Sequence, residues 1–487
     1  MGAPGKKRGR KIASSAISAR LNPRITLEAQ PDGSIAACFD GYSDGLGRFS
    51  PGAVDRALAL HSGLPFDRFV STGRHPDQEI ELLVQRLARR GLLEYRLADP
   101  NGRKDLVVIE PQLADYWPRL PRLGATDVIA LSRFSYLRRR GNEMVLESPR
   151  AGALFRICDP KVAAALALLS TPQRISRLRR REGFPGAELI ALLLDCGILF
   201  KVDAAGDGLR ASEGDDDLVM WDFHDLLFHA RSTGGRQANP LGGLYPFAEV
   251  ISPLPGVRPP WPGKRIELDG FLASAAVSPM AQLLRERHST RDFDDNRPIT
   301  LGELSRFLDR TARVQSNWGS KPDFAEEGPD IEYTTRLYPS GGNAYELELY
   351  LAVANCEGLA RGFYHYDAGG HALVEIDTPA HQLEAMLAAA EFAIGASAAP
   401  QILITIAARF GRISWKYSSI AYSLILKDVG VLIQTLYLIA TDMGLGGCAI
   451  GTNDIDRFSK MTGIEFHIEG PVGQFALGRG STTEAQG

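Results

Sequence analysis

Two stretches in the first half of the chain repeat one pattern of apolar and polar positions. In residues 77–97 and again in residues 186–202, apolar residues at helical spacing end at a glycine, and a short β-prone run follows. Another helical stretch precedes each of them, at 51–63 and at 159–170. Helix, helix and strand in this order is typical of a winged helix, and its recurrence after roughly 100 residues indicates a duplicated module.

Between these two stretches, apolar and polar positions alternate as in β-strands. The alternation runs from 128 to 157 and breaks at Gly141 and again before Gly152, which predicts a small β-meander. An acidic linker follows at 203–217. A run rich in proline and glycine at 253–264 is semi-rigid, so we expect a domain boundary there.

These patterns divide the chain into four predicted parts. They are a disordered basic arm at 1–24, a winged-helix-like module at 25–125, a β-meander with a second winged-helix-like module and a linker at 126–262, and a C-terminal domain at 263–487. The last part is long enough for one α/β or α+β domain. Its most apolar stretch, from Ile420 to Met443, has helical spacing and predicts a long buried helix, in the core or at a dimer interface.

The whole-chain totals exclude several classes of protein. The 487 residues carry a net charge of −3, so the charge balance gives no reason to expect binding to DNA or to an anionic membrane. No uninterrupted apolar run reaches membrane-spanning length, and the basic N-terminus lacks the apolar segment of a secretory signal. The cysteines are odd in number and scattered, which argues against a disulfide framework and favours a reducing cytoplasm: they are Cys38, Cys158, Cys196, Cys356 and Cys448. We expect a cytoplasmic, bacterial protein.

Two local patterns allow other interpretations. Residues 174–183 carry five arginines that would suit DNA phosphates, but the first module has no such stripe, so docking of a protein or peptide is favoured. His224 and His229 are five residues apart, whereas zinc ligands on one helix face are spaced i, i+4. An amphipathic helix with two histidines at its edge is therefore favoured, and no metal is expected.

The first candidate for chemistry in the C-terminal domain is the charged stretch ERHSTRDFDDNRP at 286–298. The stretch has three arginines, and two of their guanidinium groups, with an imidazole and a hydroxyl, suit a terminal phosphate; a solvated surface loop is the alternative. Thr300 is the expected N-cap of the next helix, which places the cluster on a loop or helix end. The cluster consists of Arg287, His288, Ser289 and Arg291.

A glycine-containing turn is the second candidate. Pro339, Ser340, Gly341 and Gly342 precede an apolar, alternating run, and the two glycines would let the backbone approach a flat ligand. Asn343 adds an amide that can donate and accept hydrogen bonds. An ordinary tight turn before a strand is the alternative. The later GLGGCA, at 444–449, is similar to a dinucleotide fingerprint but follows a predicted helix rather than a strand, which excludes a Rossmann site.

Several motifs together resemble one known family. RHSTRDFDD looks like the phosphate-binding start of the FMN-dependent nitroreductase fold. YPSGGNAYELELY and LKDVGVLIQTLYLIATDMGLGGCAIG resemble its SagB-type branch, the azoline dehydrogenases of thiazole/oxazole-modified peptide biosynthesis. WDFHDLLFHARS and LSRFSYLRRRGNEMVLESPRAGALF look like the N-terminal half of SagB-type proteins, so the resemblance covers about residues 125–487.

The resemblance implies an α+β fold with a C-terminal FMN domain, in which helices surround a central antiparallel-type sheet. It implies that the charged cluster holds the FMN phosphate, that the turn lines the isoalloxazine, and that a glycine-rich segment near 447–451 brings backbone amides to the flavin edge near N5. The residues carried over are Arg287, His288, Ser289 and Arg291 for the phosphate, with Arg479 from the C-terminus; Pro339, Ser340, Gly341 and Asn343 for the ring; and Gly447, Ile450 and Gly451 for the flavin edge.

The resemblance also implies a mechanism. An azoline becomes an aromatic azole when a hydride leaves to flavin N5 and a proton leaves to a base. Lys416 and Tyr417 match the Lys-Tyr pair of azoline dehydrogenases, and a cation beside a phenol favours the phenolate. Taken without the resemblance, the same residues would be a solvated lysine and a packing tyrosine.

The expected partners follow from the same resemblance: a second copy of the chain in a homodimer, an azoline-containing precursor peptide, the cyclodehydratase that makes the azolines, and molecular oxygen to reoxidise the flavin. Two other functions stay open at this point. One is a nicotinamide-dependent nitro- or quinone reductase of the same fold, and the other is a non-catalytic subunit that docks a peptide.

Overall fold

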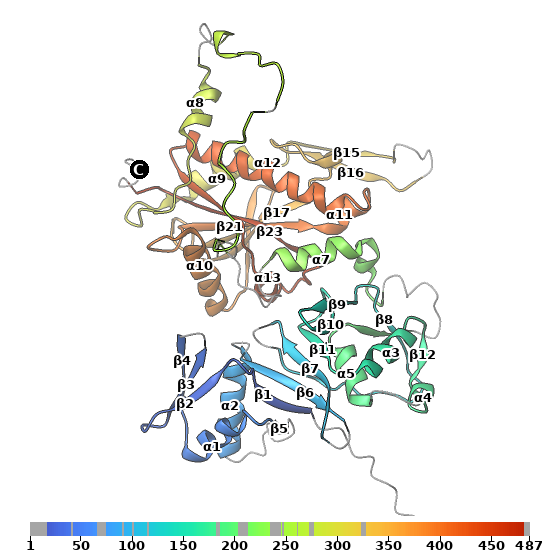
Figure 1. Cartoon of the computed structure of the whole chain (residues 1–487). Coiled ribbons are helices and arrows are strands. Elements are labelled where there is room, and N and C mark those ends of the chain that lie inside the picture. Colours follow the sequence, from blue (N-terminus) through green and yellow to red (C-terminus); the bar gives the residue numbers. More distant parts are fainter. Residues whose placement is uncertain are drawn as a thin grey trace, which may run out of the picture. The chain divides into compact units, whose positions relative to one another are not determined.

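The computed structural model (Figure 1) describes residues 17–39, 42–65, 75–89, 92–99, 102–113, 116–181, 186–202, 213–233, 245, 248–260, 262–271, 277–322 and 328–481. The chain divides into two compact units. Unit 1 consists of Met1–Arg231 with Gly235–Ala238, and unit 2 consists of Ser232–Gly234 with Asn239–Gly487. The division therefore precedes the run at 253–264, where the sequence predicts the boundary.

Unit 1 contains one order of elements twice, with one additional short helix in the second series. The first series is β1 (Ile17–Leu21), α1 (Pro51–Ala59), β5 (Leu64–Pro65), α2 (His75–Arg89) and β6 (Leu93–Ala98). The second is β8 (Val128–Leu131), α3 (Pro160–Leu168), β12 (Gln173–Arg174), α4 (Ile175–Leu178), α5 (Ala187–Asp195) and β13 (Leu199–Lys201). The strands pair in the orders β5-β1-β6 and β12-β8-β13, so the first strand of each series lies between its short strand and its last strand. This common order supports the predicted duplication.

A seven-stranded sheet joins the first series to the predicted meander. Its order is β5-β1-β6-β7-β11-β10-β9, with β7 (Asp105–Pro111), β9 (Tyr136–Arg140), β10 (Glu143–Glu147) and β11 (Ala153–Ile157). The meander is confirmed for β9 to β11, whereas β8, at its predicted start, pairs with β12 and β13 instead. The sheet therefore crosses the predicted limit between residues 125 and 126.

The arm predicted for 1–24 is wrong at its C-terminal end. Ile17, Ala19 and Leu21 are buried in β1, which pairs along its length with β6. Arg20 donates a hydrogen bond to the buried Glu94. In this stretch apolar residues occupy every second position, which is typical of a β-strand, and the neighbouring basic residues make this alternation hard to recognise. Residues 1–16 lie outside the described residues.

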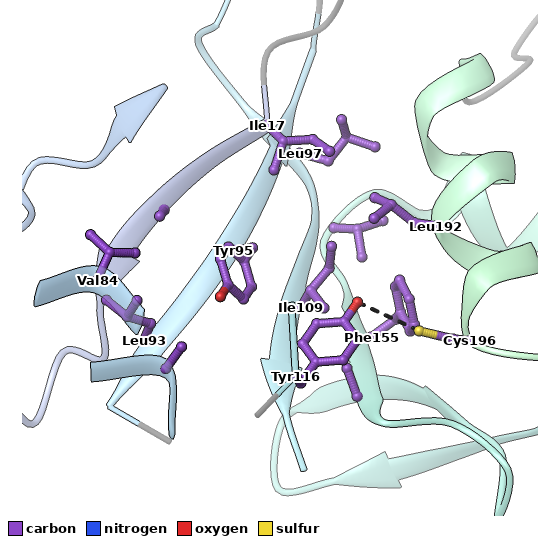
Figure 2. Close-up of a cluster of buried hydrophobic side chains, with 14 of the residues drawn as sticks. Ile17, Val84, Leu93, Tyr95, Leu97, Ile109, Tyr116, Phe155, Leu192 and Cys196 are labelled. Carbon is purple, nitrogen blue, oxygen red and sulfur yellow. Dashed lines mark hydrogen bonds between the residues drawn. The ribbon is translucent and has the colours of Figure 1, made fainter. Parts of the chain in front are cut away.

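The core of unit 1 packs the seven-stranded sheet against α2 and α5. Figure 2 shows Tyr116 and Phe155 beside Cys196, whose Sγ lies 3.5 Å from the Tyr116 hydroxyl, and Tyr95 lies on the other side of Tyr116, with ring centroids 6.1 Å apart. A smaller antiparallel sheet, β2 (Thr26–Ala29), β3 (Ser34–Phe39) and β4 (Tyr42–Arg48), follows β1 in the chain. All five cysteines are free thiols in this structure.

The two histidines that could have suggested zinc do not share a ligand site. Both lie on α7 (Phe223–Ser232), after the 3-10 helix η2 (Asp216–Met220). The His224 side chain is 85% exposed and contacts Asp222, whereas His229 is fully buried and its ring stacks on Trp221. Among the described residues, no group of three or more His, Cys, Asp or Glu could hold a metal ion.

Unit 2 is built on a six-stranded antiparallel sheet in the order β20-β19-β17-β21-β23-β22. Its strands are β17 (Leu347–Val353), β19 (Gly362–Asp367), β20 (Ala372–Ile376), β21 (Ile402–Arg409), β22 (Gly446–Ile450) and β23 (Glu469–Gly478). Helix α12 (Ala421–Asp442) packs on one face with α9 (Leu301–Thr311), and α10 (Ala380–Ile394) and α13 (Ile455–Thr462) pack on the other (Figure 1). The predicted α+β class, with helices around an antiparallel sheet, is confirmed.

Short elements connect this framework. They are η3 (Asp269–Phe271), α8 (Pro279–Glu286), β14 (Ile299–Thr300) paired with β18 (Cys356–Glu357), the hairpin of β15 (Ser316–Ser320) and β16 (Ile331–Thr335), η4 (Gly341–Asn343) and α11 (Phe410–Ser414). Thr300 caps α9 as predicted, and Glu303 completes the capping box.

Helix α12 confirms the long apolar helix predicted for 420–443, but only one of its faces is covered. Its buried residues include Ile425, Leu432 and Leu436, which face β22 and β23. Leu426 and Val431 on the other side are more than a third exposed. Within the described part of the chain, α12 is the one helix long and apolar enough to cross a membrane, and its packing on the sheet accounts for much of that apolar character.

Candidate active site

The turn before β17 meets the Lys-Tyr pair, although the two are far apart in the sequence. We call residues 339–343 the glycine turn. Lys416 and Tyr417 follow α11, and Lys416 Nζ donates a hydrogen bond of 3.3 Å to the Gly342 carbonyl oxygen. Gly342 has a φ of 58°, and a Cβ at this position would collide with the Tyr417 hydroxyl. A larger residue here would be strained and would displace the Lys-Tyr pair, because the turn and the pair lie in direct contact.

Buried carboxyl groups, which the sequence reasoning missed, fix the glycine turn. Asp428 on α12 accepts hydrogen bonds from the Ser340 hydroxyl at 2.9 Å and from the Gly341 amide at 2.8 Å. The Ser340 hydroxyl also lies 3.3 Å from Oε2 of Glu346. A serine has one proton to donate, so it cannot satisfy two ionised carboxylates at once. The geometry therefore favours a protonated Glu346.

The surroundings of Glu346 agree with this protonation state. Its side chain is fully buried, and Oε1 has no hydrogen-bond partner among the described residues. Burial first, and then the nearby Asp428, raise the pKa of Glu346 to about 7. The sequence contains one indication of a buried carboxyl group at this place, namely a glutamate directly before the apolar strand β17.

The predicted phosphate cluster lies at the end of α8 and contacts α12. We call residues 287–291 the arginine segment. The Arg287 guanidinium lies over the Tyr437 ring, 5.1 Å from its centroid, and the Ser289 hydroxyl lies 2.9 Å from the Tyr437 hydroxyl. Arg287 and Ser289 are half-buried, while His288 and Arg291 are exposed. Two of the four predicted residues, Arg287 and Ser289, thus contact the same aromatic side chain, that of Tyr437.

Tyr437, which the sequence did not single out, also joins the arginine segment to β22. Its hydroxyl accepts a hydrogen bond of 2.8 Å from Ala449 N. Thr290 N donates to the Gly447 carbonyl oxygen at 2.9 Å, and a Cβ on Gly447 would collide with the Phe475 ring. The structure therefore brings together the segments predicted for the phosphate and for the flavin edge. Of that second segment, Ile450 is buried at the end of β22, and the next residue, Gly451, is exposed.

Arg479 has a different set of contacts from those of the arginine segment. Its guanidinium donates to both carboxylate oxygens of Glu303, at 2.8 and 2.9 Å, and to the main-chain oxygen of Arg297. Burial alone would raise the pKa of Glu303, but the hydrogen bonds from Arg479 and Thr300 lower it. In this structure, Arg479 stabilises the start of α9, and a contact with phosphate stays a prediction.

The donor groups of both regions fit FMN. The arginine segment offers guanidinium and hydroxyl donors for a phosphate, and the glycine turn exposes Gly342 and Asn343 to a flat ring. Asp428 and Tyr437, which anchor the two regions, are about two and a half turns apart on α12. They therefore lie at opposite edges of the buried face of the helix.

Comparison with protein families gives two matches in different parts of the chain. Residues 129–238 match the model described as "Cyanobactin oxidase ThcOx", and residues 284–479 match the nitroreductase family. The second match includes the arginine segment, the glycine turn, the Lys-Tyr pair and Arg479. The two matches, in this order, agree with the resemblance to SagB-type proteins.

Solved structures with a similar arrangement differ strongly from this chain in sequence. The microcin synthetase McbBCD complex of Escherichia coli, with truncated pro-MccB17 bound, includes a chain that is 18% identical and has a TM-score of 0.38; the match covers 57% of the present chain and 99% of that one. A nitroreductase from Desulfovibrio desulfuricans in complex with FMN is 14% identical with a TM-score of 0.28, over 43% and 91% of the two chains.

A curated relative is more similar in sequence. The protein MJ1384 of Methanocaldococcus jannaschii, described as a nitroreductase, is 32% identical over 187 residues, which are 37% of the present chain and 84% of the relative. Since both the family model and this relative match the domain that carries the site, the chain belongs to the nitroreductase family of oxidoreductases, with a ThcOx-type region before the nitroreductase domain.

Proposed function

We propose that this protein is an FMN-dependent dehydrogenase that oxidises thiazolines or oxazolines in a ribosomally made peptide to thiazoles or oxazoles. The observation that carries the proposal is the contact of the Lys-Tyr pair with the glycine turn at Gly342. The ThcOx-type match in the same chain supports an oxidase of modified peptides rather than a reductase of small molecules.

FMN would be held through both regions of the site. Arg287, Ser289 and Arg291, with His288, would bind its phosphate, and the amides of the glycine turn and of β22 would contact its ring. When bound, FMN would accept a hydride from the azoline. The role of Asp428 is to hold Ser340 and Gly341 in place, so that the turn needs no rearrangement when the ring binds.

The Lys-Tyr pair would remove the proton that accompanies the hydride. Lys416 is exposed and Tyr417 is half-buried, so both can reach a ligand at the turn. The ammonium of Lys416 is held by the Gly342 carbonyl and lies 5.7 Å from the centroid of the Tyr417 ring. A cation at this place stabilises a phenolate, and a positioned base accelerates proton removal by roughly 10²–10⁴-fold. We therefore assign the base to Tyr417 and its activation to Lys416.

Two features support a homodimer. The exposed side of α12 carries Ser423, Lys427, Gly430 and Gln434, with the apolar Leu426 and Val431 at its two borders, and a second copy would cover this mixed surface. In addition, the arginine segment and the glycine turn lie at opposite edges of α12, so one FMN molecule would contact both most easily if each came from a different copy. A homodimer would then be a requirement for the site, rather than an addition to it.

Unit 1 would dock the precursor peptide or the cyclodehydratase that makes the azolines. Its repeated helix and strand order and the ThcOx-type match at 129–238 support this role. The McbBCD structure is that of a microcin synthetase complex with truncated pro-MccB17 bound, so in that protein several subunits and a peptide form one assembly. A cytoplasmic location and reoxidation by oxygen stay predictions.

The test is to incubate the protein with a cyclised precursor peptide and to follow the loss of two hydrogens per ring by mass spectrometry. Single-turnover bleaching of the flavin, without oxygen, then isolates the chemical step. Tyr417→Phe keeps the ring and Lys416→Met keeps most of the stem, so each variant should retain FMN and bleach at least about 10²-fold more slowly.

Three results would contradict the proposal. Bleaching of both variants at the wild-type rate would make the pair structural. Rapid reduction by NADH or NADPH, without any oxidation of azoline peptides, would instead assign a nitro- or quinone reductase. A purified wild-type protein that never retains flavin would favour the non-catalytic docking subunit.

A further inference from the structure

The hairpin of β15 and β16 carries a stacked aromatic pair outside the core. Every residue of β15 is exposed, and β15 pairs with no strand other than β16 in the described structure. Trp318 lies directly opposite Tyr333 in the strand register, and their rings stack with centroids 5.7 Å apart and planes 20° apart. Trp318 is 42% exposed, so one large flat surface is available to a ligand. We call this hairpin the aromatic hairpin.

The aromatic hairpin is fixed to the active site by side-chain contacts. Arg412 on α11 donates to the main-chain oxygens of Glu332, in β16, and of Ala344, directly after the glycine turn. One guanidinium therefore sets the distance between the hairpin and the turn. Lys416 Nζ lies 5.5 Å from the centroid of the Tyr333 ring. The ammonium of the Lys-Tyr pair thus lies near two aromatic rings, those of Tyr333 and Tyr417.

The chemistry of this surface favours one class of ligand. A flat, uncharged five-membered ring can stack on the Trp318–Tyr333 pair with little loss of side-chain freedom, because the pair is already stacked. The Lys416 ammonium beside it can donate to a ring nitrogen, whereas a cationic ligand would be repelled by Lys416 and Arg412. A merely structural cross-strand pair would explain the stacking, but not the ammonium that Tyr333 shares with the glycine turn.

We propose that the Trp318–Tyr333 pair is the ring-binding wall of the active site and selects peptide segments that contain an azoline or azole ring. This inference rests on the proposed dehydrogenase function and extends it to the residues that recognise the substrate. Tyr333 would also act as a positioning residue that holds Lys416 between its own ring and the ring of Tyr417.

The experiment measures binding of two fluorescein-labelled peptides to the full-length protein by anisotropy. The first peptide carries one central thiazole, and the second carries alanine at the same place. Trp318→Ala should weaken binding of the thiazole peptide by about three- to tenfold, the range expected for loss of one aromatic stack, and should change binding of the alanine peptide by less than about twofold. Trp318→Phe should restore most of the difference.

A matched control removes another exposed aromatic side chain of unit 2. Phe392 on α10 is 89% exposed, and α10 packs on the face of the sheet opposite α12, so Phe392→Ala should leave both affinities unchanged. Equal affinities of wild type and Trp318→Ala for the thiazole peptide would overturn the inference. So would an equal loss for both peptides, or a dimer that dissociates on Trp318→Ala, which would assign the pair to a contact between copies.

The kinetic counterpart separates this inference from the proposed function. With a single-thiazoline peptide, Trp318→Ala should raise the half-saturating concentration by the same factor and leave the maximal rate of flavin bleaching within about twofold. If wild-type protein does not oxidise the peptide at all, the dehydrogenase proposal fails. If it does, and Trp318→Ala has the same concentration dependence, only the ring-binding wall fails.

Discussion

Replacing Glu346 with glutamine should remove a large part of the pH dependence of unit 2 stability. Glu346 is fully buried beside Asp428, and burial with that neighbouring charge raises its pKa from 4.5 to about 7. An acid with a raised pKa in the native state binds its proton more tightly there than in the unfolded chain. Its stabilising effect is therefore complete below about pH 4.5 and is lost as the pH rises through 7.

The magnitude follows from the shift. Each unit of pKa corresponds to about 1.4 kcal/mol, so a change from 4.5 to about 7 lowers the free energy of unfolding by about 3 kcal/mol between mildly acidic and alkaline pH. Glu346→Gln keeps the shape of the side chain, and its amide group can donate a hydrogen to the Ser340 hydroxyl oxygen in place of the acid proton; that oxygen lies 3.3 Å from Oε2 in the native protein. The variant cannot ionise, so this contribution disappears.

The assay is urea unfolding of both proteins from pH 5 to pH 9, followed by tryptophan fluorescence and by far-ultraviolet circular dichroism. At pH 5 the two should differ by less than about 1 kcal/mol, and at pH 9 the glutamine variant should be more stable by about 3 kcal/mol in the transition of unit 2. Glu375, which is exposed on β20, supplies the control: Glu375→Gln should leave the slope unchanged. A Glu346→Gln variant with the wild-type slope would mean that Glu346 is ionised in the native protein, which would refute its protonation beside the glycine turn.

Three further substitutions test the geometry of the site. Gly342→Ala should lower the rate of flavin bleaching by azoline peptide at least about tenfold, because its Cβ would displace the Lys-Tyr pair. The control is Gly341→Ala, which should be tolerated because its Cβ would make only ordinary contacts of 3.5 Å or more. Equal rates for the two variants would refute the contact between Gly342 and the Lys-Tyr pair. Arg287→Ala should weaken FMN binding about 10- to 100-fold, as measured by flavin fluorescence titration. The control is Arg285→Ala, at an exposed position, which should bind FMN like the wild type. Equal FMN affinities of Arg287→Ala and the wild type would show that the arginine segment does not bind the phosphate. Tyr437→Phe loses the hydroxyl that ties the arginine segment to β22, so it should cost about 1–2 kcal/mol in urea unfolding and lower the FMN content on purification; a variant with unchanged stability and flavin would show that the hydroxyl is dispensable.

The sequence by itself determined the local elements that carry the site. The 3.6-residue period of 420–443 specified α12, and Thr300 with Glu303 specified the start of α9, because periodicity and capping act within a few residues. The order of motifs determined the family, and with it the candidate residues of the arginine segment, the glycine turn and the Lys-Tyr pair. The same local reasoning failed at β1, where basic residues concealed the alternation of Ile17, Ala19 and Leu21.

Only the tertiary structure decided which side chains meet. The Ser340 hydroxyl bonds Asp428 across 88 residues, and the Ser289 hydroxyl bonds Tyr437 across 148. Neither partner on α12 stands out in the sequence, since a buried aspartate and a tyrosine in an apolar helix have no spacing of their own. The raised pKa of Glu346 depends on burial and on Asp428, which no local pattern encodes. Contacts of this kind arise from the packing of α12 against the sheet and its loops, because folding brings distant segments together through their buried faces, whereas the sequence pattern specifies only which face of each segment is buried.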